Sequence, residues 1–240
     1  MLDVSAIIQT AQQAKLPKTL EVGGVHYTNQ DLKIVAPPLP AALHGETLQA
    51  VVDYVKHAPD GAKDMYIQIL NYRTVCVIGP PTGAKSERPL YLKAQAVERW
   101  NNKFQPNQYM PAKNFIIWLM QGFYPGQNTE YLLDLVNSLK AGKLIEAKDN
   151  RLTQVVTVKR GTQSSFEEIR NPLPLTPYRT FPEIGPIPQV FLVRAEDARD
   201  EEQPPELALV DADAGNYEVT VAAAIKDWLK QQLPEAIIIG

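Results

Sequence analysis

Residues 171–194 read NPLPLTPYRTFPEIGPIPQVFLVR, and they constrain the fold more than any other stretch of this sequence. Their six prolines predict an extended path, because proline restricts its own backbone and cannot donate to a helical ladder. The path runs into the apolar residues 190–194, which predict a strand. We expect this strand to form a hairpin with the apolar residues 207–211.

Side-chain alternation indicates how the extended path is anchored. In an extended backbone, Tyr178 and Thr180 would face one way, and Arg179 and Phe181 the other. We expect Phe181 to be an anchor against the core. Arg179 would either pair with a carboxylate or face a ligand as a cation.

A helical hairpin is predicted upstream of this path. Residues 112–123 place apolar side chains at helical spacing, and Ile117 and Trp118 make this helix apolar almost all round. Such a helix must be covered on several sides, by its own domain or by another subunit. After Pro125-Gly126, Asn128 is the candidate cap of a second helix.

The rest of the chain mixes helices and strands without a regular order. Helices are predicted at 3–14, behind the cap Thr47, and after Gly215-Asn216, where an amphipathic C-terminal helix begins. The apolar tail 237–239 is expected to add as a strand to a sheet, its own or a neighbour's. Further extended pieces are predicted at 20–28, 32–36, 66–79, 90–97 and 152–158. The predicted fold class is therefore α+β, with mixed or antiparallel sheets.

Three regions are expected along the chain. Residues 1–40 would hold an N-terminal helix and short strands, 41–145 an α+β region with the helical hairpin, and 152–240 a β-rich region with the C-terminal helix. The charged, glycine-containing stretch 142–151 is the candidate boundary. The acidic residues 195–206 are most simply a solvated loop.

Composition limits the class of protein. The formal charge is −3, so no global basic field attracts phosphate backbones or anionic lipid, although a local basic groove stays possible. Apolar runs such as 115–120 are far shorter than the roughly 20 residues that span a bilayer, and the first residues lack the cationic start of a secretory signal. The single cysteine, Cys76, excludes an intrachain disulfide. We expect a cytoplasmic protein without a membrane partner.

The sequence holds no motif for catalysis, metal or cofactor binding. Residues 79–86 resemble a phosphate-binding loop, but the glycine spacing is wrong and Ala84 separates Gly83 from Lys85, which favours an ordinary hairpin loop. The histidines are scattered, so no metal site is predicted. Cys76 lies in an apolar run and is expected to be a buried structural thiol. Asp211 and Asp213 are expected to be turn residues.

Nucleic-acid binding has some support. Arg99, Trp100 and Lys103 interleave cations with an aromatic ring, and Tyr178 and Arg179 add a second such pair. Single-strand binders combine stacking rings with cations in this way. The simpler alternative is that the rings pack in the core and the cations are solvated.

Several motifs resemble a domain-of-unknown-function family of tailed phages and prophages typified by YfdQ. They are Asn171-Pro172, Tyr178-Arg179-Thr180-Phe181, Glu183, and the runs 191–194 and 208–213; weaker similarity extends to 48–55, 108–115 and 224–229. The resemblance implies a phage-encoded intracellular protein, expressed with early or DNA-metabolism genes, and carries over no catalytic residue. The family's counterpart of residues 196–206 is shorter, so the acidic loop would be an insertion.

Three functions follow as hypotheses. The first is a phage accessory protein that forms homo-oligomers and acts by binding nucleic acid or a host factor, without catalysis. The second is an enzyme that processes nucleic acid or nucleotides with a site assembled from dispersed residues. The third is an inhibitor of a host defence system.

Overall fold

The structure is a computed structural model that divides the chain into two units: Met1–Leu39 with Thr82–Glu87, and Pro40–Pro81 with Arg88–Gly240. It describes residues 13, 19–22, 25–28, 41–57, 64–82, 86–97, 106–140, 143–149, 154–160, 163–196 and 205–240. In the first unit, β1 (Thr19–Val22) and β2 (Val25–Thr28) form an antiparallel hairpin, so the extended piece expected at 20–28 is two strands. The strand predicted at 32–36 lies outside the described residues, as does the helix predicted at 3–14 apart from Gln13.

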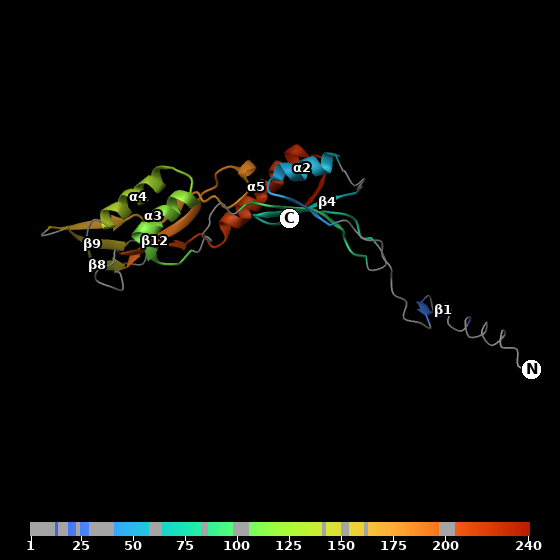
Figure 1. The fold of residues 1–240 in the computed structure, drawn as a ribbon, viewed down its shortest axis with the longest axis horizontal. Coiled ribbons are helices and arrows are strands. Elements are labelled where there is room, and N and C mark those ends of the chain that lie inside the picture. The colour runs from blue at the N-terminus through green and yellow to red at the C-terminus, as the bar shows by residue number, and fades with distance from the viewer. Residues whose placement is uncertain are drawn as a thin grey trace, which may run out of the picture. The chain divides into compact units, whose positions relative to one another are not determined.

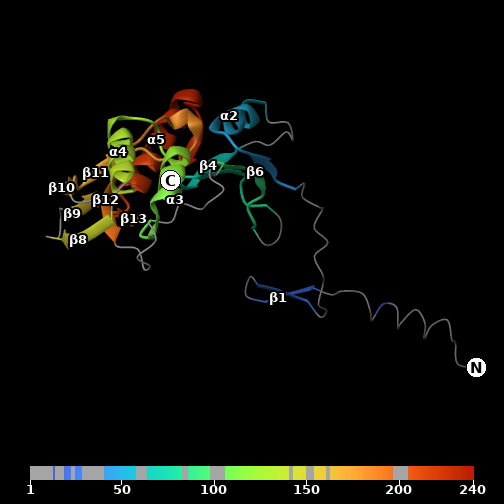
Figure 2. The ribbon, with the colours of Figure 1, turned by 60° about the vertical axis from the view of Figure 1, so that its left-hand side comes forward.

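A five-stranded mixed sheet forms one half of the second unit. Its order is β14-β4-β5-β6-β3, with the bounds Ile237–Ile239, Tyr66–Asn71, Thr74–Ile78, Leu90–Gln95 and Leu43–Gly45. The helices α2 (Leu48–His57) and α5 (Asn216–Gln232) pack on one face of this sheet (Figure 1). Figure 2 shows α2 above β4 and β6 from a second direction.

Local sequence signals explain both helices. The Thr47 hydroxyl accepts a hydrogen bond from the Ala50 backbone N–H (3.2 Å), which confirms Thr47 as the cap of α2. The Gln49 N–H donates to Oε1 of Glu183 (3.1 Å), so a carboxylate from the proline-rich path also lies at this positive helix end. In α5, the stripe Val221, Ile225 and Leu229 is fully buried, as its spacing predicted.

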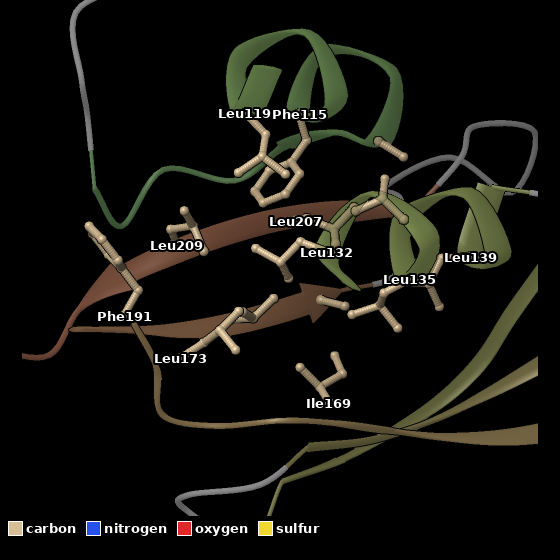
Figure 3. Packing of buried hydrophobic residues seen from close by; sticks show 14 of the residues in the cluster. Phe115, Leu119, Leu132, Leu135, Leu139, Ile169, Leu173, Phe191, Leu207 and Leu209 are labelled. Atoms are coloured by element: carbon tan, nitrogen blue, oxygen red, sulfur yellow. The ribbon is translucent and has the colours of Figure 1, made fainter. Parts of the chain in front are cut away.

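A four-stranded antiparallel sheet forms the other half. Its order is β11-β12-β13-β7, with the bounds Leu173–Leu175, Gln189–Glu196, Glu206–Asp211 and Met110–Pro111. The hairpin predicted between 190–194 and 207–211 is confirmed as β12 and β13. The helices α3 (Ala112–Gly122) and α4 (Gln127–Lys140) cover this sheet, and Figure 3 shows their apolar side chains over the strands that carry Leu207 and Leu209. Phe191 belongs to the same buried cluster.

A third, three-stranded antiparallel sheet has the order β10-β9-β8 and adds Val156 and Ile169 to the same core. The bounds of its strands are Gln163–Ile169, Gln154–Arg160 and Lys143–Asp149. The stretch 142–151, expected to be a boundary, therefore largely forms β8, because its backbone pairs with β9. Both buried clusters take residues from the 41–145 and 152–240 regions, so these two regions share their cores.

The helical hairpin is confirmed, with one correction at its turn. Helix α4 begins at Gln127, and the Asn128 amide donates to the Pro174 carbonyl (2.8 Å) instead of capping the helix. The Thr129 hydroxyl donates to the Tyr124 carbonyl (2.9 Å) at this turn. Asn128 thus joins the hairpin to β11, a contact between segments that sequence spacing does not reveal.

The apolar tail lies in its own sheet. Strand β14 pairs in parallel with β4, placing Ile237 beside Tyr66 and Ile239 beside Gln68. The Lys226 ammonium donates to the carbonyl oxygen of Gly240 (2.7 Å). The predicted fold class, α+β with mixed and antiparallel sheets and a C-terminal amphipathic helix, is confirmed. Among the described residues, no helix is long and apolar enough to cross a bilayer.

Candidate nucleic-acid interface

Arg179 lies between the two halves of the second unit. Its guanidinium donates from Nη1 to the Gln189 side-chain oxygen (2.9 Å) and from Nη2 to the Tyr72 hydroxyl (2.8 Å). It also lies 5.1 Å from the centroid of the Tyr72 ring and 5.4 Å from that of the Tyr217 ring. A cation over aromatic rings is attracted by their quadrupole, so both rings help to hold this charge in place.

A chain of hydrogen bonds orients the group behind Arg179. Gln189 is buried, and its amide donates to Oδ2 of Asp211 (3.0 Å) while its oxygen accepts from Arg179. The second Asp211 oxygen accepts from the Asp213 backbone N–H (3.2 Å). In this network of hydrogen bonds each side chain fixes the direction of the next one, so the Arg179 guanidinium is pre-oriented.

Asp213 lies two residues before Gly215, the N-cap of α5, and bonds to the backbone at the start of this helix. Its carboxylate accepts from the backbone N–H groups of Gly215 (3.1 Å) and Tyr217 (3.0 Å). Burial raises the pKa of this carboxyl, and the neighbouring Asp211 carboxylate raises that pKa further. Asp213 lies in the turn before α5, which confirms the prediction that it is a turn residue. The same prediction is wrong for Asp211, because it is the last residue of β13 and pairs with Phe191.

Tyr217 is the most buried ring of this group. Its side chain is 1% exposed, and it meets the Tyr72 ring edge-on with centroids 6.0 Å apart. Its hydroxyl makes no hydrogen bond to any described residue. Burial raises the pKa of this phenol, so the group is neutral at physiological pH.

A second pair of rings lies beside Arg179. The rings of Tyr124 and Tyr178 have centroids 3.9 Å apart at an interplanar angle of 38°. Backbone bonds position both tyrosines: Tyr178 N–H donates to the Gly122 carbonyl (2.9 Å), and Tyr124 N–H donates to the Thr176 carbonyl (2.8 Å). The end of α3 therefore fixes where the proline-rich path presents Tyr178.

These side chains border a small hollow. Tyr124, Tyr178, Arg179 and Thr180 line it together with Val97, and its volume is about 10 Å³. That is room for about one water molecule. A ligand would therefore lie against the rings instead of entering a pocket.

The structure brings together part of the predicted set of binding residues. Tyr178 and Arg179 share the hollow. Arg99, Trp100 and Lys103 belong to residues 98–105, which lie outside the described part of the chain. Val97, which precedes that segment, lines the same hollow.

Tyr72, Tyr124 and Gln189 were missed by sequence reasoning. Tyr72 lies in the turn between β4 and β5, Tyr124 follows α3, and Gln189 begins β12. Each reaches the site through contacts between segments distant in the chain. In the sequence, each of these residues is an aromatic or amide residue beside a turn or strand. This pattern is common in any fold and does not indicate a binding site.

The predicted alternation from Tyr178 to Phe181 is wrong. The Thr180 hydroxyl donates to the Tyr72 backbone carbonyl (2.8 Å), and Arg179 bonds to the same residue through its hydroxyl. The backbone bends at Tyr178 and Thr180, so neighbouring side chains can reach one partner. Phe181 is 1% exposed within the cluster beneath α2 and α5, which confirms it as an anchor.

The other sequence candidates have structural roles. Strands β5 and β6 pair antiparallel, so residues 79–86 connect a hairpin as predicted; Lys85 lies outside the described residues. Cys76 is buried, and burial raises the pKa of its thiol while the Lys93 charge lowers it, so the thiol is protonated and inert. Among the residues that the structure places, no three His, Cys, Asp or Glu side chains gather as a metal site.

Comparison with protein-family models, curated proteins and solved structures gives no match for this chain. The resemblance to the YfdQ-typified phage family therefore stays a prediction based on the motifs quoted above.

Proposed function

We propose that this protein is a phage-encoded accessory protein that acts in the host cytoplasm by binding single-stranded nucleic acid. The observation that carries the proposal is the shared hollow of Val97, Tyr124, Tyr178 and Arg179. From Val97 the chain continues into the segment with Arg99, Trp100 and Lys103. The phage origin has its support in the sequence motifs alone.

The chemistry of the hollow suits bases better than a specific small molecule. Tyr124 and Tyr178 are half-buried and lie at the rim of the hollow. Base stacking on an aromatic ring contributes about 1–3 kcal/mol per base and tolerates any sequence. The positive charge of the pre-oriented Arg179 guanidinium would attract a phosphate.

Net charge makes a local interface necessary. The chain as a whole is acidic, with a formal charge of −3, so long-range attraction to a polyanion is weak. Binding would depend on a few cations near the hollow, and the affinity would fall with salt in proportion to the number of phosphates that they neutralise.

The experiment is fluorescence anisotropy with labelled oligothymidylate and oligouridylate at low salt, about 50 mM. Tyr178→Ala should weaken binding about 5- to 100-fold, which is the loss of one stacking contact. Tyr131→Ala is the matched control, because Tyr131 is also half-buried and lies under an arginine, Arg170, 4.4 Å from its ring centroid. Absence of binding by the intact chain, or equal losses in the two variants, would overturn the proposal.

We also propose that the protein forms homo-oligomers through α3. Ile117 is 48% exposed and Met120 is 64% exposed, one turn apart on this helix. Symmetric packing of two such flanks would bury apolar surface on both copies. A host protein that covered this flank would instead favour the hypothesis of host-factor binding or defence inhibition.

The enzymatic alternative has less support. The carboxylates of Asp211 and Asp213 interact with each other, and both accept hydrogen bonds from backbone or amide groups. Carboxylates used in this way orient a turn and a helix start. Acid–base catalysis requires such a group within reach of substrate.

A further inference from the structure

The five-stranded sheet has one face that α2 and α5 do not cover. Strand register places one row of side chains on it, crossing the sheet from β14 to β3: Ile239, Gln68, Cys76, Lys93 and His44. Register places Ile237, Tyr66, Ile78 and Leu90 in a neighbouring row. The helices that pack on this sheet contact the alternate residues, such as Val75 and Val77. Within the described part of the chain, the contacts that the helices make with this sheet lie on that one side, and we call the opposite side the open face.

The open face carries apolar and cationic side chains, and its exposed part lies away from Cys76, which is only 4% exposed. Ile237 is 55% exposed and Ile239 is 49% exposed. Among the strand positions in the two rows, Lys93 is charged at neutral pH and none is a carboxylate. The Arg88 guanidinium adds a second positive charge, 5.1 Å from the centroid of the Tyr66 ring. Lys93 and Arg88 place positive charge on this face although the whole chain is acidic, which favours an anionic partner.

The open face continues into the hollow. Ala96 is buried in the cluster under the helices, so its neighbours Gln95 and Val97 point to the opposite side. Lys93 and Gln95 therefore lie on the same side of β6, and Val97 follows two residues beyond the end of the strand. Val97 is 49% exposed and lines the hollow with Tyr124, Tyr178 and Arg179.

We infer that single-stranded nucleic acid held at the hollow continues along β6 across the open face. Lys93 and Arg88 would contact phosphates, and Tyr66 with Arg88 would offer a stacking surface for a base. The amides of Gln68 and Gln95 can donate to and accept from base edges. This inference rests on the proposed function and gives it a binding site several nucleotides long.

The experiment compares two lengths of the same oligothymidylate, about 4 and about 12 nucleotides, and both lengths lie within the usual range of site sizes. The intact chain should bind the longer strand at least about tenfold more tightly. Lys93→Glu should remove most of this advantage and leave affinity for the short strand within about twofold, while Lys93→Arg should keep the advantage. Lys56→Glu is the matched control, since it makes the same charge change on the exposed surface of α2.

The outcomes separate the two proposals. A length advantage that survives in Lys93→Glu, or that Lys56→Glu removes equally, overturns the open-face inference and leaves the hollow as the binding site. Absence of binding at either length by the intact chain overturns both. Thermal unfolding of each variant is measured in parallel, and if Lys93→Glu is unfolded, Arg88→Gln replaces it with the same expected loss for the long strand.

Discussion

The side-chain amide of Gln154 forms two hydrogen bonds with the backbone of Ala195, one to its carbonyl and one from its N–H, each 2.8 Å long. Asn171 makes the same pair of bonds with Val193, at 3.0 and 2.7 Å. Strand β11 pairs with β12 only from Gln189 to Phe191. The two amides therefore take over the role of a neighbouring strand along the rest of that edge of β12.

Gln154→Ala should destabilise the protein by about 2 to 5 kcal/mol, because the Ala195 N–H and carbonyl would lose their partners in a buried position. Urea denaturation monitored by circular dichroism measures the change. Gln231→Ala is the control, since Gln231 is exposed on α5. An equally small loss in both variants would show that water satisfies the Ala195 backbone.

Phe181→Ala should cost about 3 to 5 kcal/mol, because the ring is buried among residues of the five-stranded half and its loss leaves a cavity. Phe181→Leu keeps most of the apolar volume and should lose much less. Differential scanning calorimetry compares the two. An unchanged melting temperature for the alanine variant would contradict the role of Phe181 as an anchor.

Asp213 should make stability depend on pH in an unusual direction. Its pKa in the folded protein is raised above the usual value of about 3.9, so the folded state holds this proton more tightly than the unfolded state. The contribution of Asp213 to stability is complete when the pH is below its pKa in the unfolded chain. It is lost as the pH rises through its pKa in the folded protein. Relative to the wild type, Asp213→Asn should therefore gain stability as pH increases above about 4.

The measurement for Asp213 is a series of urea midpoints from about pH 3.5 to about pH 7. Asparagine cannot reproduce all the hydrogen bonds of the Asp213 carboxylate, and this loss lowers stability by the same amount at every pH. The readout is therefore how the stability difference between wild type and Asp213→Asn changes with pH. Asp134→Asn, on α4, serves as the control for removing one carboxylate. A difference between wild type and Asp213→Asn that stays flat with pH would refute the raised pKa.

Light scattering should find an oligomer that depends on α3. Replacing Ile117 and Met120 together by serine removes the exposed apolar flank and should give a monomer. Val219→Ser, at a position 70% exposed on α5, should leave the particle size unchanged. A monodisperse monomer for the intact chain at micromolar concentration would rule out the homo-oligomer.

Local sequence patterns were enough to predict several elements. Thr47 ahead of an apolar stripe predicted α2, and the stripe Val221, Ile225 and Leu229 predicted α5. Paired apolar runs predicted the hairpin of β12 and β13. In each case the signal lies within a few residues, because caps, helical periodicity and strand alternation are local properties of the backbone.

By itself, then, the sequence determined the α+β class, the helical hairpin and the burial of Phe181. Tertiary structure decided that 143–149 pairs as a strand, that the tail lies parallel to β4, and that Tyr124 and Tyr72 meet the path carrying Tyr178 and Arg179. These features depend on which distant segments share a sheet or a core. Register and packing between such segments arise from the whole chain, so no local pattern encodes them.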